Sequence, residues 1–396
     1  MQTTLAPGVD WVGAIDWNIR DFHSYDTERG ATYNAYLVRD EKTVLVDTVK
    51  APFFEQHIHR IRDLVDPAKI DYVVCNHAEP DHSSGLPQLL KAVPNAKLLC
   101  SAKCRETLGR EYDAADWPFQ VVKTGETLPI GRRALSFLET PMVHWPDSMM
   151  TYDAADRILF SMDAFGQHIA TSGRFDDEND LYLLLSEAKT YYANIVLPYS
   201  TFVRKTLEGA AKLDIGQIAP SHGVVWRGHV ADILRLYGAW SAGRNRPKVV
   251  VLYDSMWDAT ARMAEAILEG ASVAGVETML LHLRRTNLTR VATEILDAAA
   301  IAVGSPVLNQ TMMPSVAAAL AYVQGLRPAN KAGMAFGSYG WSAKGGADGV
   351  QACLEAMKWE ILHPPIRACY RPDAAILDEC RRAGALLAEH SRSAVS

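Results

Sequence analysis

The feature that most constrains the fold is a regular alternation of apolar strand-like runs with helical stretches between Lys248 and Ser391. The strand-like runs are Lys248–Tyr253, Glu277–His282, Ile301–Val303, Lys331–Phe336 and Glu360–Ile366. The helical stretches are Thr260–Ala274, Thr289–Ala300, Pro314–Gln324, Gly346–Met357 and Pro372–Ser391. Strands that alternate with helices build βαβ units. We therefore predict a doubly wound parallel sheet for this region.

A polar segment separates this region from the residues before it. Ser241–Pro247 contains glycine and proline and ends where the first strand of the alternating region begins. A chain of 396 residues is also too long for one ordinary core. We therefore predict an α/β protein with two domains, residues 1–246 and residues 247–396.

The first domain is expected to mix hairpins with helices. Its strand-like runs are Tyr33–Val38, Lys42–Asp47, Tyr72–Cys75, Lys97–Cys100, Arg133–Glu139, Met149–Asp153 and Arg157–Phe160. Its helical stretches include Phe53–Leu64 and Leu86–Val93. This mixture predicts a sandwich of sheets flanked by helices.

Charge and composition exclude several classes of function. The formal net charge is −6, which disfavours nucleic-acid binding because that needs a basic face. The N-terminal residues do not read as a signal peptide, and no apolar run reaches the length needed to cross a membrane. Its six cysteines form no C-x-x-C pair, so no rubredoxin-type iron centre is encoded. We expect a cytoplasmic protein that binds neither nucleic acid nor membrane.

Four side chains that can bind a metal lie within six residues, in the segment His77-Ala78-Glu79-Pro80-Asp81-His82. The segment follows a strand-like run, so its loop can direct all four side chains into one cleft. Three further candidates, His144, Asp163 and His222, also follow apolar runs.

These seven residues predict a site for two metal ions. Seven ligands are too many for one tetrahedral zinc, but they fit two ions that share a carboxylate. A single histidine after a strand is usually an ordinary loop residue, so no one of them decides the matter. The six-residue segment does, because its acidic and imidazole groups would repel one another or stay unsatisfied without a cation.

A second constellation follows the first strand of the alternating region, in the segment Tyr253–Thr260. Hydroxyl and backbone N–H groups there can hold a phosphate at the positive end of a helix. The loop lacks G-x-G-x-x-G, which disfavours a dinucleotide site. A flavodoxin-type FMN phosphate site fits the loop instead.

Two more loops, Gly304–Asn309 and Ser338–Ser342, follow later strands and are expected to hold the flavin ring. Any one aromatic residue there is as well explained by core packing as by ring contact. The three loops together predict FMN. The residues we assign to its binding are Ser255, Met256, Trp257, Thr260, Ser305, Pro306, Asn309, Ser338, Tyr339, Gly340 and Trp341.

The metal segment resembles the H-x-H-x-D-H motif of the metallo-β-lactamase fold, with Glu79 in place of the second histidine. The pattern H-x-E-x-D-H is that of flavodiiron proteins. A carboxylate hardens the site and adds negative charge, which favours iron. The resemblance covers nearly the whole chain. It includes the C-terminal domain and the segments Gly30–Tyr36, His144–Ser148, Asp163–His168 and Ala188–Asn194.

The resemblance implies a metallo-β-lactamase-like αββα sandwich with two non-haem irons, followed by a flavodoxin-like domain with FMN. It assigns His77, Glu79 and His144 to one iron, and Asp81, His82 and His222 to the other. Asp163 would bridge them. Some family members do not use the position of His82 as a ligand. His23, His168 and Tyr192 are expected around the irons, with the Tyr192 hydroxyl directed at bound substrate.

The family implies reduction of dioxygen to water, of nitric oxide to nitrous oxide, or of both. No rubredoxin-like or flavin-reductase segment follows within the 396 residues, so we expect a separate donor such as rubredoxin or a flavin reductase. The family also implies a head-to-tail homodimer or a dimer of dimers. Two alternatives remain open: a zinc-dependent hydrolase with a flavodoxin module, and a plain flavodoxin-type electron carrier with an inactive N-terminal domain.

Overall fold

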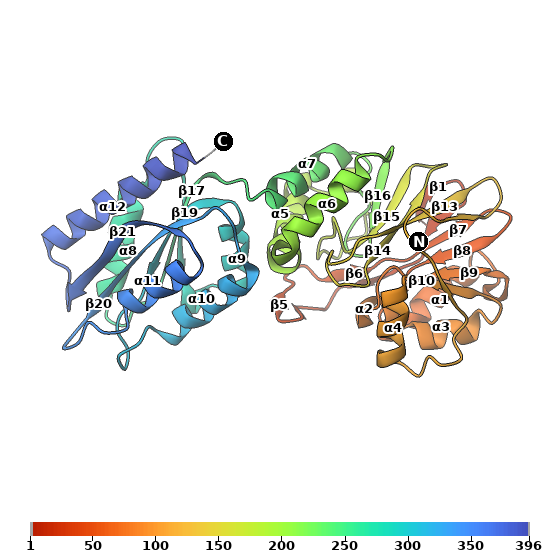
Figure 1. Ribbon diagram of the computed structural model, residues 1–396, viewed down its shortest axis with the longest axis horizontal. Coiled ribbons are helices and arrows are strands. Elements are labelled where there is room, and N and C mark those ends of the chain that lie inside the picture. Colours follow the sequence, from red (N-terminus) through yellow and green to blue (C-terminus); the bar gives the residue numbers. More distant parts are fainter. Residues whose placement is uncertain (1–2, 395–396) are drawn as a thin grey trace. The chain divides into compact units, whose positions relative to one another are not determined.

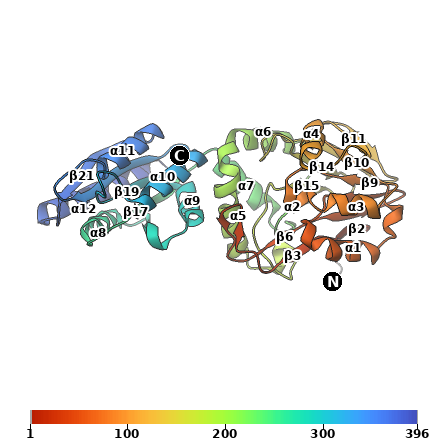
Figure 2. The same cartoon turned by 90° about the horizontal axis from the view of Figure 1, so that it is seen from below.

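A computed structural model describes residues 3–394 as two compact units, drawn as ribbons in Figures 1 and 2. The units are Met1–Gly238 and Ala239–Ser396, so the division lies inside helix α7 (Val230–Ser241). The predicted boundary at residues 246 and 247 lies further along the chain, where the polar segment leads into strand β17 (Arg246–Tyr253).

Two large sheets form the centre of the N-terminal unit. The first has the order β1-β2-β7-β8-β9-β10-β11, antiparallel from β1 to β8 and parallel from β8 to β11. Its strands are β1 (Thr3–Ala6), β2 (Val9–Trp11), β7 (Tyr36–Arg39), β8 (Thr43–Val46), β9 (Tyr72–Val74), β10 (Lys97–Cys100) and β11 (Phe119–Val121).

The second sheet has the order β12-β13-β14-β15-β16. Its strands are β12 (Thr127–Pro129), β13 (Ala134–Glu139), β14 (Met149–Asp153), β15 (Ile158–Met162) and β16 (Gln217–Pro220). Two small two-stranded sheets pair β3 (Ala14–Asp16) with β6 (Ala31–Tyr33) and β4 (Asp21–Phe22) with β5 (Tyr25–Asp26).

Helices cover both outer faces of this pair of sheets. Buried apolar residues from both sheets form one core between them. A second core lies between the first sheet and its helices. The second sheet is covered by α5, α6 and α7 (Figures 1 and 2). The helices are α1 (Phe54–Arg62), α2 (Pro80–Ser83), α3 (Leu86–Ala92), α4 (Ala102–Glu111), α5 (Leu181–Tyr191), α6 (Ser200–Ala210) and α7. The αββα sandwich is confirmed.

The C-terminal unit has a five-stranded parallel sheet in the order β18-β17-β19-β20-β21. Its strands are β17, β18 (Glu277–His282), β19 (Ala298–Gly304), β20 (Ala332–Tyr339) and β21 (Glu360–Cys369). Its helices are α8 (Ala259–Ala271), α9 (Leu288–Leu296), α10 (Pro314–Leu326), α11 (Ala347–Ala356) and α12 (Ala374–Ser393). One core contains residues of α8 and α12, and the other contains residues of α9, α10 and α11, so helices pack on both faces. The predicted doubly wound sheet is confirmed.

Two predicted elements differ from the structure by more than a shift of their ends. The predicted helix Thr289–Ala300 ends at Leu296, and the alanines from Ala298 onward belong to β19. Alanine has the highest helix propensity, but a fully buried place between β17 and β20 overrides it. The predicted strand Tyr33–Val38 is two strands, interrupted at Asn34. The Asn34 side chain accepts a hydrogen bond from Trp11 Nε1 and donates hydrogen bonds to the carbonyl oxygens of Pro220 and Gly223.

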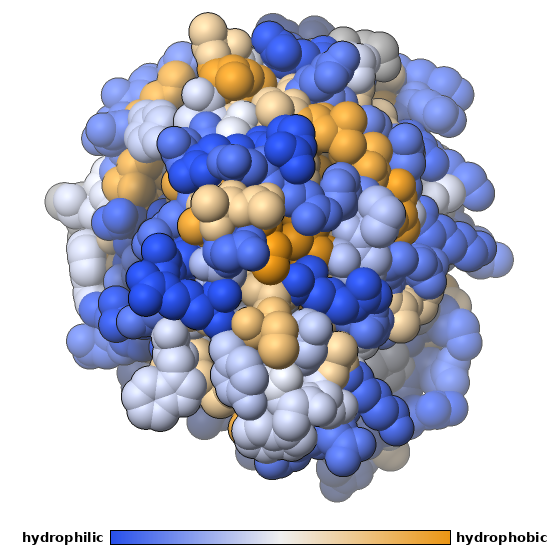
Figure 3. All heavy atoms as spheres, turned by 90° about the vertical axis from the view of Figure 1, so that its left-hand side faces the viewer, coloured by the Kyte–Doolittle hydropathy of each residue, from blue (hydrophilic) through white to orange (hydrophobic). Residues whose placement is uncertain are grey.

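Hydrophilic residues dominate the face of the C-terminal unit that Figure 3 turns to the viewer, with apolar side chains in several separate groups. Within residues 3–394, the helices are too short or too polar to cross a bilayer.

Candidate functional site

The seven predicted metal ligands come together at one edge of the N-terminal sandwich. The segment from His77 to His82 follows β9, His144 lies in the loop between β13 and β14, Asp163 follows β15 and His222 follows β16. The ligand atoms of one group, His77, Glu79, His144 and Asp163, lie within 4.8 Å of one another. Those of Asp81, His82 and His222 do the same. We call these residues the seven-residue cluster.

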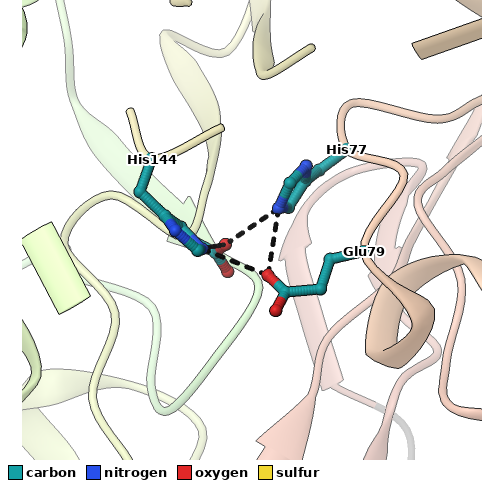
Figure 4. Close-up of side chains that lie close together, drawn as sticks. His77, Glu79 and His144 are labelled. Carbon is teal, nitrogen blue, oxygen red and sulfur yellow. Dashed lines mark hydrogen bonds and ion pairs between the residues drawn. The ribbon is translucent and has the colours of Figure 1, made fainter. Parts of the chain in front are cut away.

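The first group is arranged around the Glu79 carboxylate. The Nε2 atoms of His77 and His144 each lie 3.1 Å from Glu79 Oε2. Figure 4 shows the two imidazole rings and the carboxylate pointing toward one another. Because α2 begins at Pro80, it turns the chain directly after Glu79 and carries Asp81 and His82 toward the second group.

Asp163 has one oxygen toward each group. Its Oδ2 lies 3.2 Å from His144 Nε2, and its Oδ1 lies 3.0 Å from His82 Nε2. In the second group, His222 Nε2 lies 3.1 Å from Asp81 Oδ2. A carboxylate placed in this way can bridge two metal ions.

Hydrogen bonds on the far side of two histidines fix which nitrogen faces the cluster. His77 Nδ1 donates to Asp147 Oδ2 at 3.0 Å, and His222 Nδ1 donates to the carbonyl oxygen of Thr32 at 2.6 Å. With Nδ1 protonated, Nε2 keeps its lone pair for a metal. The sequence did not single out Asp147 or Thr32, although Asp147 stands three residues after His144.

Burial makes this concentration of charge costly without a cation. Both oxygens of Asp81, both nitrogens of His82 and Asp163 Oδ1 are buried without a hydrogen-bond partner. Burial alone would lower the pKa of His82, but the carboxylates of Asp81 and Asp163 raise it to about 9. Burial would raise the pKa of Glu79, yet hydrogen bonds from His144, His23 and His77 hold it well below its usual range. The residues present therefore fit a metal pair, whose charge replaces these protons.

His23 lies beside the cluster, next to Glu79. Its Nε2 is 3.1 Å from Glu79 Oε1, and half of its side chain is exposed. The hydrogen bond to Glu79 is the largest cause of its raised pKa.

Tyr192, which was expected around the irons, contacts Ser200 and Tyr237. Its hydroxyl lies 2.9 Å from Ser200 Oγ, and its ring packs on Tyr237. The ring of Tyr191 instead lies 5.9 Å from that of His222 and 4.9 Å from that of His168. A π-helix, Tyr192–Val196, begins immediately after α5, and the two neighbouring tyrosines face different surroundings.

A second site is a pocket of about 1160 Å³ that the loops after β17, β19, β20 and β21 line. We call it the aromatic pocket. Eight of the eleven residues assigned to flavin binding line it: Met256, Trp257, Pro306, Asn309, Ser338, Tyr339, Gly340 and Trp341. Arg262, Tyr370 and Arg371 also line it and were missed. Tyr370 and Arg371 follow the fifth strand, so the rule used for the other loops should have included them.

The three remaining residues have their hydroxyls in internal hydrogen bonds beside the pocket. Ser255 Oγ accepts a bond from Ala261 N at 3.3 Å, and Thr260 Oγ1 lies 2.9 Å from Ser338 Oγ. Ser305 Oγ donates to the carbonyl oxygen of Pro306. Ser255 and Thr260 thus lie at the predicted phosphate loop, whereas Ser305 braces the loop after β19.

The chemistry of the pocket suits a flat ring joined to an anion. Trp257 and Trp341 are 91% and 94% exposed and can cover a planar group. Helix α8 opens at the same pocket, and Asp258, its N-cap, makes no side-chain cap bond. The positive end of a helix without such a cap favours an anionic group.

Comparisons with known proteins identify the family of each domain. Residues 31–223 match the ODP family of β-lactamases, and residues 251–384 match the flavodoxin family. A nitric oxide reductase of Moorella thermoacetica is 44% identical over 91% of each chain. An anaerobic nitric oxide reductase flavorubredoxin of Salmonella arizonae is 39% identical over 97% of this chain and 81% of its own length.

Solved structures show the same similarity over the whole chain. The flavodiiron protein of Giardia intestinalis is 40% identical, with a TM-score of 0.95, and covers 100% of this chain and 98% of its own. Rubredoxin oxygen:oxidoreductase of Desulfovibrio gigas is 39% identical, with a TM-score of 0.97 and full coverage of both chains. With its lactamase-type and flavodoxin-type domains, the chain belongs to the flavodiiron protein family of oxidoreductases.

Proposed function

We propose that this protein reduces dioxygen to water, nitric oxide to nitrous oxide, or both, with two non-haem irons and FMN, taking electrons from a separate redox protein. The observation that carries the proposal is Asp163, which turns one carboxylate oxygen to each of the two ligand groups. The relatives named for nitric oxide reduction and for rubredoxin-dependent oxygen reduction support both gases.

We assign His77, Glu79 and His144 to one iron, Asp81, His82 and His222 to the other, and Asp163 to both. Two irons and one FMN, when bound, supply the four electrons that convert dioxygen to two waters. Glu79 favours iron over zinc, because carboxylate oxygen is a harder ligand than imidazole. The alternative of a zinc-dependent hydrolase lacks this support, since hydrolytic relatives carry histidine at that position.

The surrounding residues handle protons and exclude water. His23 connects the half-exposed entrance with Glu79 Oε1 and can carry the protons that water formation consumes. His168 is buried, and burial lowers its pKa well below the usual value, so it stays neutral beside His222. Tyr191 closes the same side with its buried ring.

We place FMN in the aromatic pocket, with its phosphate at the loop Tyr253–Thr260. Because Trp257 and Trp341 are exposed there, an external donor such as rubredoxin or a flavin reductase can approach the flavin. The family resemblance further leads us to propose a homodimer or a dimer of dimers, which sedimentation velocity will test.

Turnover with each gas tests the proposal. Protein loaded with iron is mixed with reduced rubredoxin under argon, and dioxygen or nitric oxide is then added in separate reactions. We expect consumption of at least one gas, about two irons per chain and one FMN released on denaturation. Stoichiometric zinc without gas consumption would overturn the proposal and favour a hydrolase.

A further inference from the structure

The charged residues that line the aromatic pocket are Arg262, Arg371 and Asp258. Among residues 3–394, neither arginine side chain has an ion pair or hydrogen bond with the protein. Arg284, by contrast, is engaged: its Nε donates to Asp254 Oδ1 at 2.7 Å and its Nη2 bonds the carbonyl oxygen of Ser255. Two positive charges are thus left for a ligand.

The two arginines follow different strands of the sheet, β17 and β21. Arg262 lies near the start of α8, two residues after Thr260, at the helix end that adjoins the loop after β17. Arg371 follows β21, which is three strands from β17. With neighbouring strands about 4.8 Å apart, the ends of those two strands are separated by about 14 Å. A single phosphate monoester at the β17 loop therefore meets only the first of them.

The β17 loop itself provides donors but no other basic side chain for an anion. Ser255 Oγ accepts from Ala261 N and keeps its own proton to donate. The buried Asp254 carboxylate has its charge compensated by Arg284. Asp258 is exposed at the N-cap and adds a negative charge, which raises the need for a cation at this end.

We propose that Arg262 is the residue that makes this pocket select a phosphorylated flavin over the same flavin without phosphate. The proposal rests on the proposed FMN site and assigns a cause to its specificity. A phosphate monoester carries close to two negative charges at neutral pH, and charge-assisted hydrogen bonds to it are about twice as strong as neutral ones. Riboflavin shares the ring and the ribityl chain but offers Arg262 no charge.

The experiment measures two dissociation constants for each variant. Flavin is removed from the full-length protein, and FMN and riboflavin are titrated separately while the quenching of flavin fluorescence is followed. In Arg262→Gln we expect the dissociation constant for FMN to rise about ten- to a hundredfold, with that for riboflavin unchanged within about twofold. Arg262→Lys keeps the charge and should recover part of the preference.

Arg371→Gln is the matched control, because it removes the same charge from the same pocket and should leave the FMN-to-riboflavin ratio unchanged. In the native protein, the affinity for FMN relative to that for riboflavin should fall as the salt concentration rises. This salt dependence should be weaker in Arg262→Gln. Circular dichroism confirms that each variant is folded.

The outcomes separate the inference from the function on which it rests. An equal loss of both flavins in Arg262→Gln, or an equal change of the ratio in Arg371→Gln, would overturn the role of Arg262 while leaving the FMN site intact. If the native protein binds neither flavin, the proposed FMN site itself fails.

Discussion

Six of the seven residues in the cluster of the N-terminal unit are buried, whereas the aromatic pocket of the C-terminal unit is lined by loops that carry exposed side chains. Asp81, His82, Asp163 and His222 are each less than 5% exposed, but Trp257 and Trp341 are more than 90% exposed. The cluster also concentrates charge that its own protons only partly neutralise. The pocket instead lies at the edge of a sheet whose two cores consist of the protein's own buried side chains. Loss of metal should therefore disturb its unit more than loss of flavin disturbs the other.

The largest effect is expected for Asp163→Ala, which removes the carboxylate shared by both groups. Two metal positions should fail together, so bound iron should fall to near zero and gas turnover should fall at least about a hundredfold. Flavin content and flavin reduction by the donor should not change. Iron analysis and turnover on the same sample check this. Retention of both irons would show that Asp163 is not the bridge.

A smaller loss is expected for Glu79→His, which gives the cluster the ligand of hydrolytic relatives. Its softer set of donors should bind less iron and retain zinc, with turnover reduced by at least about tenfold. Glu79→Asp keeps a carboxylate and serves as the control. Full activity of the histidine variant with iron would refute the argument from ligand hardness.

Asp147→Asn tests the hydrogen bond behind His77. An amide is a poorer acceptor than a carboxylate, so His77 should be held less firmly and metal affinity should fall about ten- to a hundredfold. Competition with a chelator of known affinity measures this. Asp113→Asn, at an exposed carboxylate, should have no effect. Equal metal retention in both variants would rule out a role for Asp147.

A substitution in the aromatic pocket should have a smaller effect than the substitutions in the cluster. Thr260→Ala removes a hydroxyl at the phosphate loop, and FMN affinity should fall about tenfold, as for one lost hydrogen bond. Thr260→Ser keeps the hydroxyl and should stay near the native value. Flavin titration measures both, and unchanged metal content shows that the two sites are independent. If Thr260→Ala lowered iron content as much as FMN affinity, the cluster and the pocket would not be independent.

The smallest effect concerns pH in protein stripped of metal. His82 has a pKa of about 9, above its ordinary value, so its charged form stabilises the fold fully below pH 6.5. That contribution is lost as pH rises through 9, and the melting temperature of the N-terminal unit should fall by a few degrees between pH 7 and 10. Metal-loaded protein should not show this loss, because its histidines are already neutral. Calorimetry of both forms decides the point.

The features that sequence could predict were those with a local signal. The apolar run of β17 and the six-residue metal segment each show their structure in consecutive residues. The alanines at the start of β19 do not, because their strand conformation depends on neighbours in the sheet. Tyr191 and Tyr192 were also beyond sequence reasoning, since a one-residue difference in direction depends on how α5 continues into a π-helix.

The exposure of Trp257 and Trp341 has a practical consequence for following this protein. Indole emission shifts with the polarity of its surroundings, and a flavin that lies against an indole quenches it. Because both side chains are almost entirely outside the core, their emission depends on what covers them. Trp226, which is wholly buried in the other unit, gives a constant background. The native chain thus carries its own optical readout of cofactor loading, and occupancy can be followed in real time without a label.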